Sequence, residues 1–494
     1  MLEGILAVLS IKTFLLILGS VTAGLLLGAI PGITVTMGVA LFLPLTYGMT
    51  PLDGLSVLMG LYMGGTTGGL IAAVLLNIPG NPACVATTFD GYPMAKRGEG
   101  GRALGLGIIG SFIGGIFSII VLILVAPRLA RVALEFGPYE YFSIAFFSLT
   151  MIATLSGKSL TKGLISASFG VVAALVGMAP ISAFSRFTFD SPNLLMGFSL
   201  LPALVGLFAF SQILEMALLP KEKEDSSIFA YKLVGLGVSL SDLKKQTGNF
   251  FRSSVLGTVI GVLPGVGGAI INIVAYALEK KLSKFPEKFG TGIDDGIVAS
   301  ETSNNACTGG ALVPTLTLGI PGDNTTAVIL AGFMIHGISP GPLLFTEHPV
   351  LVYGIFASLL VANIVMFGLS YWTLRACVKL LSVPKNILLP VVGAMCVIGS
   401  YGLDNSFFDI WTMVIFGIMG FVLLRFQFPL APLILGFILG PIIETNLRRG
   451  LQRSDGDLTP FLTEPISGAF LLITAIIVGF TVYSGLKQKK AKAA

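Results

Sequence analysis

Apolar segments follow one another along this whole chain, and most end at a glycine, a proline or a short polar stretch. Of the 494 residues, 54% are hydrophobic and only 11% are charged, whereas soluble globular proteins have roughly 25% charged residues. The apolar runs are continuous, while the strands of a membrane β-barrel alternate apolar and polar residues. The sequence therefore predicts an all-α polytopic membrane protein with about 12 transmembrane helices of about 20 residues each.

The first apolar stretch and the charged residues narrow the class further. No basic segment precedes this stretch and no clear cleavage site follows it, so we expect the first span rather than a signal peptide. The net charge of +5 comes mostly from loops and a basic C-terminal tail, and we expect no nucleic-acid partner. The cysteines lack CxxC spacing and are expected to be small packing residues: Cys84, Cys307, Cys377 and Cys396.

Two motifs occur twice in the same order. "GAIPGITVTMG" (28–38) resembles "GVLPGVGGAI" (261–270), and "LNIPGNPACVATTFDGYP" (76–93) resembles "LGIPGDNTTAVILAGFMI" (318–335). Because both motifs recur at a nearly constant offset, they indicate an internal duplication. Each motif contains a Pro-Gly pair, which removes a backbone donor and loosens a helix. One such pair is typical of an ordinary kink, but four in matched positions predict a broken-helix or re-entrant hairpin in each half: Pro31-Gly32, Pro79-Gly80, Pro264-Gly265 and Pro321-Gly322.

The distribution of basic residues predicts that the two halves are inverted. We divide the chain into an N-terminal half (1–219), a polar linker (220–252) and a C-terminal half (253–494) that ends in extra helices. The loop at 96–102 is basic and its counterpart at 336–349 has no lysine or arginine, whereas 47–54 is free of basic residues and its counterpart at 279–288 has four lysines. Cytoplasmic loops are enriched in basic residues, so corresponding loops are predicted on opposite sides. Inverted repeats with broken helices are typical of secondary transporters.

Hydroxyl and amide residues flank the second pair of breaks, and we predict that they bind an anion. Glycines leave backbone N–H groups accessible, and helix N-termini add positive partial charge, so a carboxylate is a suitable ligand. Side-chain and carbonyl oxygens would instead suit a small cation such as Na⁺. We expect a β-branched residue at Gly80 or Gly322 to crowd the backbone and to disfavour a positive φ. The candidate binding residues are Thr66, Thr67, Asn77, Gly80, Asn81, Asn304, Asn305, Thr308, Gly322, Asp323, Asn324 and Thr325.

Other acidic residues and the histidines leave alternatives open. Asp323 fits a helix N-cap as well as a site residue, because "PGDNTT" is a good helix start. Asp90 is expected to be a turn or cap residue, and Glu301 lies near the proposed site. His336 and His348 stand apart from other ligand types, so no metal site is predicted.

No nucleophile constellation or nucleotide-binding motif appears, and we do not expect an enzyme. Without a Walker motif, transport needs an ion gradient or a separate ATPase. A membrane-embedded enzyme or assembly factor that acts on lipid-type substrates is the alternative from another class, and a passive channel is a third.

Four long stretches resemble the large membrane subunit of the tripartite tricarboxylate transporters, the TctA-like family. They begin "GAIPGITVTMGVALFLPL", "GGTTGGLIAAVLLNIPGNPACV", "GVLPGVGGAIINIVAYALEKK" and "ASETSNNACTGGALVPTLTLGIPGDN", and the resemblance covers essentially the whole chain. It implies a permease of the bacterial inner membrane that imports carboxylates, driven by a gradient of Na⁺ or H⁺, with no cofactor. It also implies two partners, a small four-helix membrane subunit and a periplasmic solute-binding protein.

Overall fold

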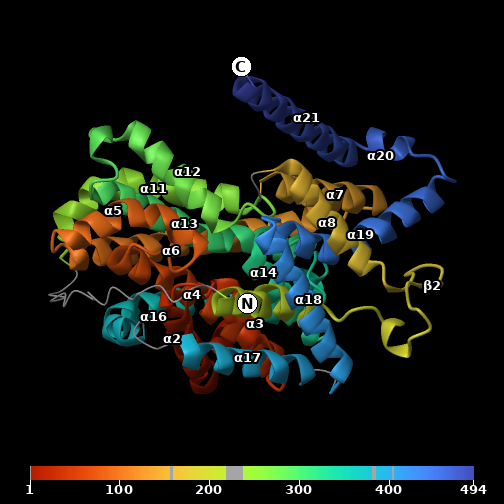
Figure 1. The fold of residues 1–494 in the computed structure, drawn as a ribbon, viewed down its shortest axis with the longest axis horizontal. Helices are drawn as coiled ribbons and strands as arrows, with labels where there is room; N and C mark the ends of the chain where they lie inside the picture. Colours follow the sequence, from red (N-terminus) through yellow and green to blue (C-terminus); the bar gives the residue numbers. More distant parts are fainter. Residues whose placement is uncertain (1, 156–158, 219–236, 381–384, 403–404, 494) are drawn as a thin grey trace. The chain divides into compact units, whose positions relative to one another are not determined.

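A computed structural model describes residues 2–155, 159–218, 237–380, 385–402 and 405–493 of the protein (Figure 1). The chain forms two compact units, and each contains segments that are distant in the sequence. Unit 1 comprises Met1–Ala130 and Gln212–Leu403, and unit 2 comprises Arg131–Ser211 and Asp404–Ala494. Among the described residues, 8 helices are long and apolar enough to cross a membrane. The prediction of an all-α polytopic membrane protein is therefore confirmed, while the count of about twelve spans stays a prediction.

Unit 1 holds the four Pro-Gly pairs and the helices around them. Its elements are α1 (Leu2–Val8), α2 (Ile11–Ala29), α3 (Val35–Phe42), η1 (Leu43–Thr46), α4 (Pro51–Leu76), η2 (Pro82–Cys84), α5 (Val85–Lys96), most of α6 (Gly100–Ala133), most of α10 (Ser211–Leu218), α11 (Leu240–Gly261), α12 (Gly267–Leu282), η5 (Pro286–Lys288), α13 (Asp294–Leu318), α14 (Asn324–Ile335), α15 (Leu344–Glu347), α16 (Pro349–Leu380) and α17 (Lys385–Tyr401).

Unit 2 is also mainly helical, with one short hairpin. Its elements are α7 (Pro138–Leu155), α8 (Leu160–Ala174), β1 (Gly177–Met178), β2 (Ser185–Arg186), η3 (Pro192–Leu194), α9 (Leu200–Val205), the π-helical turn η4 (Gly206–Phe210), α18 (Phe407–Arg425), α19 (Leu430–Arg453), α20 (Thr459–Thr463) and α21 (Pro465–Ala493). The two strands pair antiparallel. Within the unit, Arg186 donates to both carboxylate oxygens of Glu444, at 2.7 and 3.2 Å, which satisfies two charges that are largely shielded from water.

Each Pro-Gly pair lies between two helices. The pairs separate α2 from α3, α4 from α5, α11 from α12 and α13 from α14. Gly32 and Gly265, in the first pair of each half, have φ angles of 91° and 77°, which glycine adopts without steric cost. Side-chain oxygens satisfy the amides that a helix start leaves unpaired, as at Thr34, which accepts a hydrogen bond from the Met37 amide.

Glycines allow close packing of α2 against α4 and of α11 against α13. A Cβ atom on Gly24 or Gly28 would collide with the backbone of α4, and one on Gly68 would collide with the Leu25 carbonyl of α2. In the second half, a Cβ on Gly257 or Gly261 would likewise collide with the backbone of α13. Small residues let membrane helices approach closely, so that dispersion contacts hold them together.

These contacts are matched between the two halves residue by residue. Residues of α2 correspond to residues of α11 at an offset of 233, and residues of α4 to residues of α13 at an offset of 242. Gly28 faces Gly65, and its counterpart Gly261 faces Cys307, which is the counterpart of Gly65. The matched packing supports the internal duplication that the sequence predicts.

The polar linker predicted for 220–252 is only partly covered by the described residues, and it stays a prediction. Its residues 220–236 lie outside the described residues, but α11 begins at Leu240, so the last part is helical. Ser239 and Asp242 form a reciprocal capping box, which starts a helix even in a polar sequence. The two predicted halves are copies of a duplicated sequence and differ from the two compact units of the structure. The division into halves stays a prediction.

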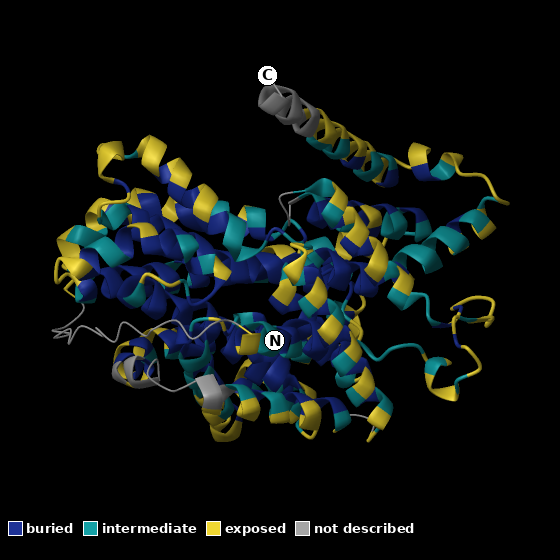
Figure 2. Ribbon diagram, viewed as in Figure 1, coloured by how far each residue is buried: buried dark blue, intermediate teal, exposed yellow. Residues whose placement is uncertain are grey.

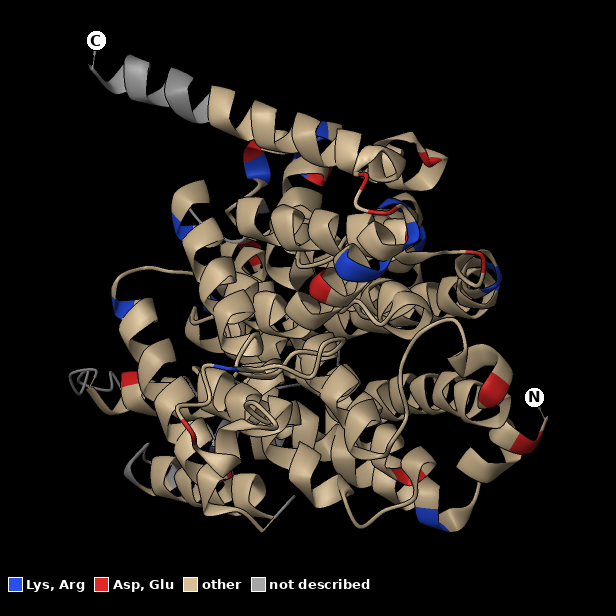
Figure 3. Cartoon of the chain, turned by 90° about the vertical axis from the view of Figure 1, so that its right-hand side faces the viewer, with Lys and Arg blue, Asp and Glu red and all other residues tan. Residues whose placement is uncertain are grey.

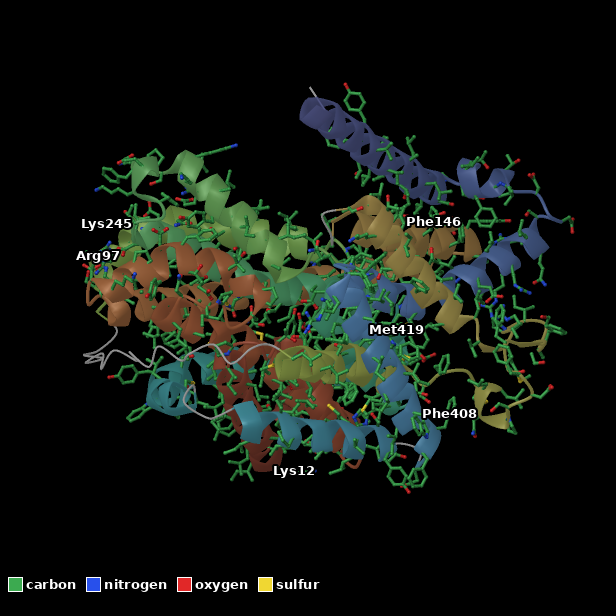
Figure 4. All side chains as sticks on the ribbon, in the orientation of Figure 1. Lys12, Arg97, Phe146, Lys245, Phe408 and Met419 are labelled. Carbon is green, nitrogen blue, oxygen red and sulfur yellow. The ribbon has the colours of Figure 1, made fainter. Side chains whose placement is uncertain are left out.

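Within unit 1, the two basic loops lie side by side. Arg97 donates to the carbonyls of Thr291 and Gly292, and Arg102 pairs with Asp294 at 2.6 Å and Asp242 at 3.0 Å. The hydrogen bonds from Arg102 hold the pKa of the Asp242 carboxyl below its usual range. Figure 4 labels Arg97 and Lys245 at one edge of this unit, and Figure 3 shows how sparse charged residues are.

The two loops without basic residues also lie together. A Cβ on Gly54 would collide with the His336 side chain, so the start of α4 lies beside the end of α14. This pairing, of the two basic loops with each other and of the two loops without lysine or arginine with each other, is what inverted repeats require. The inversion itself, relative to a membrane, stays a prediction.

Candidate functional site

Helices α4 and α13 cross at the centre of unit 1, and both are almost entirely buried (Figure 2). Thr67 Oγ1 donates to Asn305 Oδ1 at 2.9 Å, and the Thr308 hydroxyl lies 3.6 Å from the sulfur of Met63. Residue numbers rise along α4 as they fall along α13, so these counterpart helices run antiparallel. The contact brings predicted site residues from the two halves together.

The first hairpin loop turns back along α4. Asn77 ends α4 in the left-handed conformation (φ 57°), and its side chain is exposed. Gly80 then lies so close to the packed α2 and α4 that a Cβ would be 2.5 Å from the Gly28 oxygen and 2.7 Å from the Gly69 Cα. Asn81 Oδ1 accepts from the Ala83 amide and so caps the short helix η2. Asn77 thus acts as a helix end in this structure, apart from the buried cluster.

The second hairpin loop repeats this path. Gly319, the counterpart of Asn77, ends α13 with a φ of 68°. A Cβ on Gly322 would lie 2.5 Å from the Ala311 Cα, the counterpart of the Gly69 contact. The expectation of a positive φ at Gly80 and Gly322 is wrong, because neither is among the glycines with positive φ. Both positions need glycine because two backbones approach closely there.

Asp323 caps α14 and also contacts α4. Its Oδ1 accepts from the Thr326 amide at 2.7 Å, and its Oδ2 accepts from the Tyr62 hydroxyl at 2.6 Å. Both carboxylate oxygens are therefore engaged within the protein. Sequence reasoning missed Tyr62, because a single tyrosine inside an apolar run carries no pattern.

The start of α12 lies between the two hairpin loops. The Gly265 amide donates to the Gly322 carbonyl at 2.7 Å, and the Gly267 Cβ position is 3.8 Å from the Asp323 Cβ. On the other side, a Cβ on Gly268 would lie 2.7 Å from Asn304 Oδ1 and 2.8 Å from the Ala83 Cβ. No side-chain hydrogen bond caps the N-terminus of α12, unlike those of α3 and α14. Its first amides are therefore available to an anion.

Two further contacts join the halves at the loops. Thr36, at the start of α3, lies 2.9 Å from Thr325 at the start of α14. Asn272 of α12 donates to the Ala83 carbonyl. Sequence reasoning missed Thr36 and Asn272, although both follow a Pro-Gly break within about two helical turns, a spacing that could have indicated them.

Two buried side-chain atoms without a hydrogen-bond partner lie at the first loop. Asn81 Nδ2 and Asn272 Oδ1 are both buried and have no hydrogen-bond partner in the structure. A buried polar group without a partner costs about 1–3 kcal/mol, so such atoms mark places where a ligand or water can bind. Asn81 is 4% exposed, and it lies next to Gly69, whose missing side chain leaves room for the amide.

Of the remaining predicted residues, Asn304, Thr66 and Thr308 are buried and Asn324 is exposed. Asn304 donates to the Cys84 sulfur at 3.8 Å, while the hydroxyls of Thr66 and Thr308 also donate to carbonyls of their own helices. Asn324 is exposed at the first position of α14, apart from the buried residues. Among the described residues, no group of three or more histidine, cysteine or acidic side chains is placed to hold a metal ion.

The arrangement provides neutral donors and helix N-termini rather than lysine or arginine. This is chemistry that binds a carboxylate or a small ion without burying a fixed cation.

Comparison with known proteins places the chain in a family. The model of the tripartite tricarboxylate transporter TctA family matches residues 14–435. The chain belongs to the TctA family. It is 35% identical over 472 residues to a protein of Agrobacterium vitis called "Uncharacterized 52.8 kDa protein in TAR-I ttuC' 3'region", covering 96% of this chain and 93% of that protein.

A second relative from Agrobacterium vitis, "Uncharacterized protein in TAR-II ttuC' 3'region", is 38% identical over 234 residues, which is 47% of this chain and 97% of that protein. No solved structure matches the chain. The resemblance to the TctA family that the sequence motifs indicate is confirmed, and with it the classification as a multi-pass membrane protein of a transporter family.

Proposed function

We propose that this chain is the permease of a tripartite system that imports organic carboxylates, of the tricarboxylate or dicarboxylate class, across the bacterial inner membrane. A gradient of H⁺ or Na⁺ drives the import. A periplasmic solute-binding protein delivers the substrate, and a small four-helix membrane subunit completes the complex. The chain is a transporter rather than an enzyme and needs no cofactor.

One observation supports this proposal above the others. The uncapped N-terminus of α12 lies between two matched polar loops, and the first of these loops carries the buried amide Nδ2 of Asn81, which has no hydrogen-bond partner. Hydrogen-bond donors in this arrangement suit a carboxylate, and membership of the TctA family agrees with that substrate class. Broken helices at the interface of inverted repeats hold substrates in many secondary transporters.

Reconstitution into liposomes tests the proposal. The chain, the small subunit and a loaded binding protein are combined, and uptake of labelled carboxylate is measured under an imposed H⁺ gradient and, separately, a Na⁺ gradient. We expect uptake above background only when all three proteins and one of the gradients are present. Full gradient-driven uptake by the chain alone would contradict the dependence on partners. If the complete system shows no uptake with the H⁺ gradient and none with the Na⁺ gradient, the transport function is contradicted.

A further inference from the structure

Glu301 is a fully buried carboxyl on α13 whose described surroundings contain hydroxyl groups and no cation. Its exposed fraction is 0%, and it lies one helical turn before Asn305. None of the ion pairs among the described residues involves it. Burial of an ionised carboxylate without a cation is strongly unfavourable, so the neutral protonated form is the one that such surroundings favour.

The carboxyl has defined hydrogen-bond partners on two other helices. Thr87 Oγ1 of α5 lies 2.5 Å from Glu301 Oε1, and Ser111 Oγ of α6 lies 3.4 Å from Oε2. Thr87 also lies 3.0 Å from Ser300 Oγ. Hydroxyls can both donate and accept, so these partners can serve either the ionised or the protonated carboxyl by rotating their hydrogen.

The same network reaches the crossing of α4 and α13. Asn305 Nδ2 donates to Ser111 Oγ at 2.7 Å, and Asn305 Oδ1 accepts from Thr67. Glu301 is therefore connected through Ser111 and Asn305 to the contact between the two halves. A change in its protonation changes which hydrogen bonds these residues make, and so it can alter how α13 packs on α4 and α6.

Neighbouring titratable groups from the surrounding helices do not supply a countercharge. Asp90, on α5, accepts from the amides of Gly290, Gly292 and Ile293 and from the Tyr276 hydroxyl of α12. Arg102, on α6, is engaged with Asp242 of α11 and with Asp294, the first residue of α13.

On α4, Tyr62 is bound to Asp323 and Asp53 pairs with Lys12. On α11, Arg252 pairs with Glu279 of α12. The Cys84 thiol, at the end of η2, lies beside the Glu301 carboxyl, but a thiol is no countercharge.

The two halves of the chain differ at the position of Glu301. The counterpart of Glu301 in the first half is Met59, which is also fully buried. The repeated fold therefore does not itself require a carboxyl at this position, so the carboxyl of Glu301 needs a functional explanation.

We propose that Glu301 carries the coupling proton of transport: its carboxylate accepts a proton from water on one side of the membrane and releases it to water on the other. This inference rests on the proposed function and adds to it the identity of the ion and of the residue that carries it. No other co-reactant is needed, because the carboxyl gains and loses only the proton.

Glu301→Gln tests the proposal, since glutamine resembles the protonated carboxyl but cannot release a proton. The complete three-protein system is reconstituted, and three quantities are measured: uptake driven by a pH gradient without Na⁺, acidification of the lumen reported by a pH-sensitive dye, and exchange of labelled for unlabelled carboxylate without a gradient. We expect a loss of at least tenfold in the first two and exchange within about threefold of the unchanged protein. Glu347→Gln, at an exposed position of α15, is the matched control and should leave all three unchanged.

Thr87→Val provides an independent test that keeps the carboxyl. Removing a hydroxyl that donates to the carboxylate disfavours the ionised form. The midpoint of the pH profile of exchange should therefore move to higher pH, and an unmoved midpoint would overturn the proposal even if Glu301→Gln fails to fold. Wild-type uptake that needs Na⁺ and ignores the pH gradient would leave the transport function standing and refute the proton role. Retained proton movement in Glu301→Gln would refute it as well.

Discussion

The hydroxyl of Thr67 on α4 donates a 2.9 Å hydrogen bond to the side-chain carbonyl of Asn305 on α13, and both residues are buried. This bond joins counterpart helices of the two sequence halves at the point where they cross. The amide nitrogen of Asn305 donates to Ser111 Oγ and to the Glu301 carbonyl. Both ends of the Asn305 side-chain amide therefore have hydrogen-bond partners. The bond therefore fixes the relative position of the two central helices.

Thr67→Val keeps the shape of the side chain and removes this bond. The buried Asn305 oxygen then lacks its partner, which costs about 1–3 kcal/mol of folding stability. A lower thermal midpoint of the detergent-solubilised protein would show this loss. Thr474→Val is the control, because the Thr474 hydroxyl is also buried but donates to a carbonyl of its own helix. Equal midpoints for the two variants would mean that the crossing does not depend on this bond.

Asn81→Asp tests the candidate carboxylate site. The aspartate oxygen can still accept from the Ala83 amide and cap η2, but the unpaired donor Nδ2 becomes an acceptor with negative charge. Loss of a hydrogen bond to a charged group costs about 1.5–3 kcal/mol, or roughly ten- to a hundredfold in affinity. The apparent affinity for carboxylate in the reconstituted system should fall by at least this factor.

Asn324→Leu tests the exposed amide at the start of the second hairpin helix in the same assay. The expected loss of apparent affinity is about tenfold, the lower end of that range. Asn193→Leu, at an exposed position in unit 2, is the control and should bind carboxylate normally. If Asn81→Asp and Asn324→Leu both reach the membrane and keep normal affinity, the loops only break the helices and the site lies elsewhere.

Alanine at Gly80 or Gly322 tests the close approach of backbones. At each position a Cβ would lie 2.5 Å from a backbone atom of a neighbouring helix, which cannot rotate away. Overpacking of this kind costs typically 1–3 kcal/mol, occasionally more. The yield of monodisperse protein in size-exclusion chromatography should fall for both variants. Gly19→Ala, where a Cβ would meet nothing within 4 Å, should leave the yield unchanged or raise it.

Single-cysteine labelling tests the inverted orientation. In a background without the native cysteines, a probe that cannot cross the membrane should reach residue 98 from the cytoplasm and residue 339 from the periplasm, since both are exposed. The expectation follows from the lysines and arginines of the first loop and their absence from its counterpart. Labelling of both positions from the same side would refute the inverted arrangement.

The sequence alone predicted the class of fold and the positions of the helix breaks. Continuous apolar runs indicate membrane helices whatever their neighbours, because backbone groups in lipid must be satisfied within the segment. The Pro-Gly pairs also break a helix through local effects alone, since proline lacks an N–H and glycine can adopt a positive φ. The duplication was visible because matched motifs recur in the same order at a nearly constant offset, and the structure repeats it in the packing of Gly28 and Gly261.

Tertiary structure decided which polar residues come together. Asn77 and Asn324 belong to the motifs as clearly as Asn81 does, yet both are exposed at helix ends, whereas Asn81 is buried next to Gly69. Tyr62 lies in an apolar run without any motif, and Asn272 lies just after one. Only the contacts between distant helices place them beside Asp323 and Ala83. Local sequence determines where a helix breaks, but the partners of a side chain depend on contacts across more than 180 residues of chain, which no local pattern encodes.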